Sequence, residues 1–153
     1  MVEENWTWSL SLIALTIVFH AAAMAAMALA LIHFYAHVTR WRLPLRHIFA
    51  ILIGVIGAVG VVLAILHGIE AAMWAAAYWR LGALGAFQDA VLYSLDSMTP
   101  RGASGLTLEP HWSLMGALEA TDGMLLFGIS TAFVFALMQA YWPILVEAHR
   151  KHS

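Results

Sequence analysis

The sequence predicts an all-α membrane protein with three transmembrane helices, and its composition, its long apolar segments and the placement of its charges support this class. Hydrophobic residues make up 63% of the 153 residues, charged residues make up 10%, and the mean hydropathy is +0.83. A soluble domain has a far more even balance of apolar and charged residues. The net charge of −2 argues against a nucleic-acid partner.

Three segments meet the length of about 20 apolar residues that a membrane-spanning helix needs. They cover about residues 8–35, 48–77 and 112–141. Glycines and prolines interrupt the chain between the second and third segments, and only residues 87–98 have room for a helix of about three turns. We expect this helix to be too short to cross a bilayer.

The segment after the short helix, residues 99–105, is rich in small residues and contains a proline. Irregular backbone at membrane depth leaves N–H and C=O groups without partners in hydrocarbon, so it persists only where protein or water surrounds it. A short helix and an irregular loop between two spans therefore predict a re-entrant segment that lines a pore. Because one chain with three spans cannot surround such a loop, we expect a symmetric oligomer.

Charge placement predicts the orientation in the membrane. Glu3 and Glu4 precede the first span, whereas basic residues gather on the opposite side, at Arg40, Arg42, Arg46, Arg150 and Lys151. The positive-inside rule then puts the N-terminus outside and the C-terminus in the cytoplasm. We expect a multi-pass protein of the inner (plasma) membrane, in contact with membrane lipid.

Several short motifs extend this interpretation. They are His67-Gly-Ile-Glu70, Trp74-Ala-Ala-Ala-Tyr78, Leu81-Gly-Ala83, Tyr93-Ser-Leu95, Gly116-Ala-Leu-Glu119 and Leu126-Phe-Gly-Ile-Ser-Thr-Ala132. Through them the chain resembles the pore domain of the tetrameric potassium-channel superfamily, in particular small prokaryotic ion-channel proteins with one extra helix before the pore unit. The resemblance implies a first helix and basic loop over residues 1–46, and a two-helix pore domain over 47–153. It also implies a homotetramer that passes inorganic ions, a pore helix over 87–98, and a third span that lines the inner cavity.

The loop departs from the pattern of that family. Where the family carries Thr-Val-Gly-Tyr-Gly, this chain aligns Pro100-Arg101-Gly102-Ala103-Ser104, with Thr99 before it and Gly105 after it. Proline lacks a backbone N–H, and Ala103 and Ser104 replace the bracing tyrosine and the second glycine. Stacked carbonyls of an intact filter replace the hydration shell of potassium. We therefore expect weak potassium selectivity.

Arg101 has three alternative roles. The resemblance implies that its side chain turns toward the pore helix, where Asp96 is a candidate partner and filter support. Four arginines that faced the axis would instead select anions, because rings of Arg or Lys attract anions in pores. The third alternative is an exposed charge at the outer mouth.

Three polar residues fall inside the first two spans. His20 and His67 each lie 12 residues from an outer tryptophan, which places both roughly 18 Å deep, and Glu70 follows His67 by one turn. We expect the two imidazoles to be close, directly or through Glu70. The alternatives for this trio are a hydrogen-bonded clamp, a pH-sensing element, and a haem or metal site of an electron-transfer bundle.

The third span contains two acids and two glycines of interest. Glu119 is expected to support the pore helix or the loop by hydrogen bonding, whereas Asp122 is either a cavity-facing acid or a structural one. Gly123 and Gly128 either let the helix bend during gating or serve packing alone. No catalytic motif occurs in the sequence and there is no cysteine, so we expect neither an enzyme nor a bound cofactor or metal.

Overall fold

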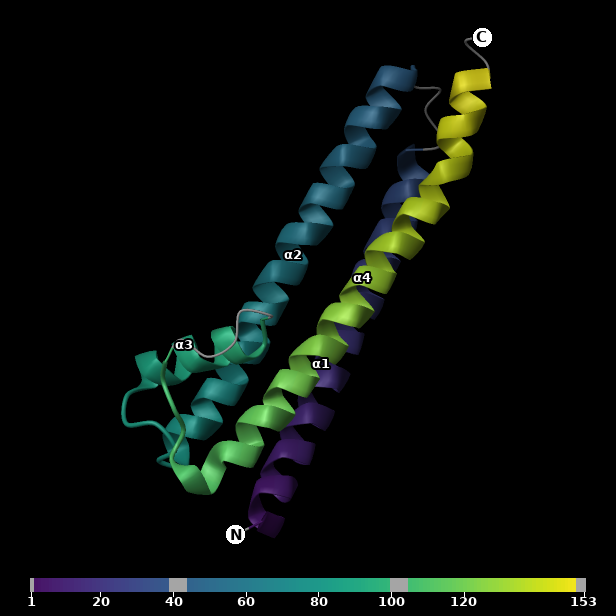
Figure 1. Cartoon of the computed structure of the whole chain (residues 1–153). Coiled ribbons are helices and arrows are strands. Elements are labelled where there is room, and N and C mark those ends of the chain that lie inside the picture. Colours follow the sequence, from purple (N-terminus) through teal and green to yellow (C-terminus); the bar gives the residue numbers. More distant parts are fainter. Residues whose placement is uncertain (1, 39–43, 100–104, 151–153) are drawn as a thin grey trace.

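Figure 1 shows the computed structural model, which describes residues 2–38, 44–99 and 105–150. Within those ranges every regular element is helical, in the order α1 (Val2–Val38), α2 (Leu45–Arg80), α3 (Phe87–Ser97), the 3₁₀ helix η1 (Pro110–Trp112) and α4 (Ser113–Arg150). The helices α1, α2 and α4 are each long and apolar enough to cross a membrane. The predicted all-helical class, with three helices long and apolar enough to cross a membrane, is therefore confirmed.

The long helices extend further than the apolar segments do. The first apolar segment was expected over 8–35, but α1 continues to Val2 and Val38. Glu3 and Glu4 occupy its first turn, where negative charge is favourable because of the helix dipole. A helix that leaves hydrocarbon does not need to end, so apolar length sets a minimum and not a boundary.

The three long helices run alongside one another, and α3 lies across α2 at the end where the N-terminus is found (Figure 1). Contacts join α3 to α2 and to α4, and α1 to both α2 and α4. At the same end, the side-chain amide of Asn5 donates a 2.8 Å hydrogen bond to the carbonyl of His111 in η1. The start of α1 is thereby fixed next to the segment that leads into α4.

A glycine turn ends α2 and directs the chain back toward α3. Gly82 has φ +71°, the left-handed conformation that side chains with a Cβ disfavour. The N–H of Gly82 donates to the carbonyl of Trp79, and the N–H of Ala83 donates to the carbonyl of Tyr78. These two bonds form a Schellman motif, which satisfies carbonyls that the helix end leaves open.

Buried apolar residues form two clusters along the bundle. One lies around α3 and the adjoining ends of α2 and α4, and the other lies near the opposite end of α2 and α4. The first includes Trp74, Tyr78, Ala90, Tyr93 and Met115, and the second includes Leu52, Val59, Leu63, Leu137 and Tyr141. Large apolar side chains also cover the outside of the bundle, as expected for a surface that meets lipid or other subunits.

Candidate functional site

The short helix α3 is held close to α4 by two glycines. A Cβ on Gly116 would collide with the phenol oxygen of Tyr93, and a Cβ on Gly123 would lie 2.7 Å from Cα of Met98. Glycine at these two positions therefore lets α3 and the residue after it approach the α4 backbone. Gly123 has a packing role here, whereas nothing lies within 4 Å of a Cβ placed on Gly128.

Glu119 lies buried where α2, α3 and α4 meet. Its Oε2 accepts a 2.8 Å hydrogen bond from the phenol of Tyr78 on α2. Ser94 on α3 lies beside the same carboxylate, although its Oγ makes no hydrogen bond of good geometry with any described residue. The described hydrogen bond of Glu119 goes to α2, while Ser94 of α3 lies beside its carboxylate, and the ring of Tyr78 contacts Tyr93 of α3 edge to face at 5.5 Å.

Asp122, one turn further along α4, is also fully buried inside the chain. Its Oδ2 accepts hydrogen bonds from Oγ1 of Thr16 at 2.7 Å and from Nε1 of Trp74 at 3.0 Å. The side chain thus joins α4 to both α1 and α2. Of the two roles expected for Asp122, this geometry favours the structural one.

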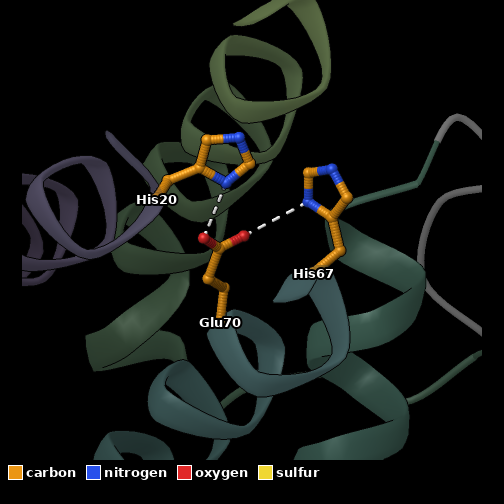
Figure 2. Close-up of side chains that lie close together, drawn as sticks. All are labelled: His20, His67 and Glu70. Atoms are coloured by element: carbon orange, nitrogen blue, oxygen red, sulfur yellow. Dashed lines mark hydrogen bonds and ion pairs between the residues drawn. The ribbon is translucent and has the colours of Figure 1, made fainter. Parts of the chain in front are cut away.

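The predicted proximity of His20, His67 and Glu70 is confirmed, as Figure 2 shows. Nδ1 of His20 lies 2.8 Å from Oε1 of Glu70, and Nδ1 of His67 lies 3.2 Å from Oε2. On the far side of both rings, each Nε2 lies 3.1 Å from Oγ of Ser130 on α4. Helices α1, α2 and α4 therefore meet at one polar cluster, in which His20 and Glu70 are fully buried and His67 is 28% exposed.

These contacts can be assigned protons by counting donors. If Glu70 is a carboxylate and both imidazoles are neutral, Nδ1 of His20 donates to Glu70 and Nε2 of His20 accepts the hydroxyl proton of Ser130. Oγ of Ser130 then accepts from Nε2 of His67. With both imidazoles neutral, Nδ1 of His67 is left as a bare lone pair that faces Oε2 of Glu70. That oxygen accepts no hydrogen bond from the described residues.

Glu70, Glu119 and Asp122 are buried acids whose contacts join neighbouring long helices. Sequence reasoning identified His20, His67, Glu70, Glu119 and Asp122 but missed their partners. The missed residues are Thr16, Trp74, Tyr78 and Ser130. Four-residue spacing could have found three of them, since Thr16 precedes His20, and Trp74 and Tyr78 follow Glu70, on the same helix faces.

The loop predicted as a filter is described only at its ends. Thr99 is exposed, and its hydroxyl donates to the carbonyl of Asp96 at 3.1 Å. Gly105 has φ +85°. Pro100, Arg101, Gly102, Ala103 and Ser104 lie outside the described residues. Asp96 is buried on α3, and its role behind the loop and its pairing with Arg101 stay predictions.

In comparisons with protein-family models, curated proteins and solved structures, nothing matches this chain.

Proposed function

We propose that the protein is a homotetrameric ion channel in which the loop of residues 99–105 from four chains forms the narrowest part of a central pore. One observation carries the proposal: an 11-residue helix, α3, is docked against two candidate spanning helices by buried contacts instead of extending away from them. A helix of this length cannot cross a bilayer. Docked in this way, it is suited to carry a loop into the membrane.

The depth of α3 supports this proposal. Met98, which follows α3, packs against Gly123, and Gly123 lies ten residues into α4 from Ser113. At 1.5 Å per residue, this is about 15 Å along the helix, roughly half of the ~30 Å hydrocarbon layer. A loop that starts at this depth needs protein or water around its backbone. Four chains around a water-filled axis supply both.

The exposed faces of α3 and α4 also fit an assembly. Leu92 and Leu95 are exposed on α3 although the opposite face of that helix is buried, and Met124 and Phe127 are exposed on α4. Neighbouring subunits would cover part of this surface. Ions then pass down their gradient, entering from the side of the N-terminus, with the C-terminus in the cytoplasm.

The haem-binding alternative is not favoured by the geometry of His20 and His67. A haem with two histidine ligands needs a flat macrocycle between the two rings. Here the rings lie side by side with centroids 5.3 Å apart, and Glu70 and Ser130 each contact both of them. Inserting a porphyrin would separate all four residues.

Purified protein in planar bilayers tests the channel proposal. We expect stepwise currents, a reversal potential near zero with potassium on one side and sodium on the other, and a tetramer by native mass spectrometry. In a gradient of potassium chloride, a reversal potential near that of chloride would indicate anion preference, the outcome expected if Arg101 faces the axis. Tightly sealed bilayers from well-folded protein, or a monomer in native membranes, would refute the proposal.

A further inference from the structure

The cluster of His20, His67 and Glu70 places Nδ1 of each ring against an oxygen of one buried carboxylate. With both imidazoles neutral and hydrogen-bonded as assigned above, Nδ1 of His67 and Oε2 of Glu70 are two acceptors 3.2 Å apart, which repel one another. The carboxylate oxygen has no hydrogen-bond donor among the described residues. A cation between the two atoms would remove this penalty.

We propose that His20, His67 and Glu70 bind one divalent transition-metal ion of the Zn²⁺ class. One ligand atom from each residue can be chosen so that all of them lie within 4.8 Å of one another. Ligands about 2.0 Å from a tetrahedral zinc ion lie about 3.3 Å apart. The separations are 2.8 Å from Nδ1 of His20 to Oε1 of Glu70 and 3.2 Å from Nδ1 of His67 to Oε2, both slightly below that value. Two imidazoles and a carboxylate suit zinc better than calcium or magnesium.

Ser130 completes the arrangement on the outer side of both rings. When both Nδ1 atoms bind the ion, each Nε2 carries the ring hydrogen and donates it. The hydroxyl oxygen of Ser130 lies 3.1 Å from both Nε2 atoms, and its two lone pairs can accept both hydrogens. Such a hydrogen bond from the second ring nitrogen is the usual means by which proteins orient a metal-binding histidine.

Charge balance favours a dication over a single positive charge. Asp122 lies close enough to interact electrostatically with both Glu70 and His20, and its hydrogen bonds come from the donors of Thr16 and Trp74. A divalent ion would offset the negative charge of Glu70 and any charge on Asp122, which lowers the cost of keeping such charges buried.

The ion can reach the cluster from the side of His67. A cavity of about 530 Å³ lies between α2 and α4, and His67 and Ser130 are its polar lining residues near the cluster. His67 is 28% exposed there, whereas Glu70 and His20 are fully buried. The fourth coordination position would therefore be open to a water molecule or another small ligand on this side.

Metal content of the untagged, chelator-treated protein in detergent tests this proposal without any measurement of ion flux, so its outcome is independent of the channel proposal. After equilibration with micromolar Zn²⁺ and removal of free ion, we expect one zinc per chain. Co²⁺ in the same site should give the intense visible absorption of a tetrahedral complex. We expect Glu70→Gln and His67→Gln to lose both signals, and Ser130→Ala to bind about 10–100-fold more weakly.

His33→Gln is the matched control. His33 and His37 are exposed one turn apart on α1, so they are the surface histidine pair that could bind zinc non-specifically. This variant should keep one zinc per chain. The proposal is overturned if the wild-type protein binds no stoichiometric zinc. It is also overturned if the cobalt-loaded protein gives only the weak spectrum of octahedral cobalt. Unchanged binding in Glu70→Gln, or lost binding in His33→Gln, would also overturn it.

Discussion

The phenol of Tyr78 donates a 2.8 Å hydrogen bond to Oε2 of Glu119, and this bond joins α2 to α4 where α3 packs against both helices. Tyr78 also contacts Tyr93 of α3 through its ring. One side chain therefore links all three elements of the proposed pore unit. Because the bond is buried and ends on a carboxylic group, its loss leaves an unpaired polar atom that water cannot solvate.

Replacing Tyr78 with phenylalanine should lower the free energy of unfolding by about 1–3 kcal/mol, since Glu119 then has no donor among the described residues. Denaturant unfolding in detergent measures the change. Tyr141→Phe is the matched control, because the buried hydroxyl of Tyr141 has no hydrogen-bond partner among the described residues. Equal effects of the two substitutions would contradict a stabilising role for the Tyr78 bond.

Gly123→Ala and Gly128→Ala distinguish packing from hinge bending. The new Cβ at position 123 would lie 2.7 Å from Cα of Met98 and force α3 away, at a cost of about 1–3 kcal/mol, and ion flux should fall. At position 128 a Cβ has open space, so Gly128→Ala should leave stability unchanged or raise it by up to about 1 kcal/mol. If Gly128 is a gating hinge, its variant will instead change flux without loss of stability.

Asp122→Asn should leave cation flux unchanged, because the side chain faces Thr16 and Trp74 and an amide oxygen can still accept from both. Asp122→Ala should cost about 1–3 kcal/mol of stability, since the indole N–H of Trp74 loses its acceptor. Asp89→Asn is the control, because it removes one negative charge at an exposed position. A drop in cation conductance in Asp122→Asn alone would indicate that Asp122 faces the pore.

Arg101→Gln tests the role of the charged residue in the loop. Asp96 is buried on α3, so an ion pair with Arg101 would be buried too, and loss of one charge of such a pair is destabilising. We expect a lower dissociation temperature of the tetramer and little change in reversal potential. Arg80→Gln, at an exposed position, should alter neither quantity. Unchanged stability together with reduced anion permeability would show that Arg101 faces the axis.

The sequence was sufficient to predict the helices and the proximity of His20 and His67, because both follow from apolar length and residue spacing. The short helix was expected over 87–98 and is observed as Phe87–Ser97. The meeting of His20 with His67 followed from their equal distance to an outer tryptophan. Those predictions needed only the rise of the α-helix.

Side-chain partners were harder to predict, for a physical reason. The spanning helices are apolar on all sides, so no hydrophobic face shows how each helix is rotated about its axis. Whether Asp122 would meet Thr16 or a water-filled cavity depends on that rotation. Glu119 likewise bonds Tyr78 of α2 with Ser94 of the short helix beside it, and the apolar pattern does not reveal which of the two helices supplies the donor.

Cysteine accessibility in the loop tests the pore most directly. The chain contains no cysteine, so Ala103→Cys introduces one reactive thiol without background. We predict that a charged, membrane-impermeant thiol reagent blocks the current of Ala103→Cys channels in planar bilayers. It should react with Thr107→Cys, at an exposed position just after the loop, without blocking current. Complete labelling of Ala103→Cys with undiminished current would contradict a pore formed by this loop.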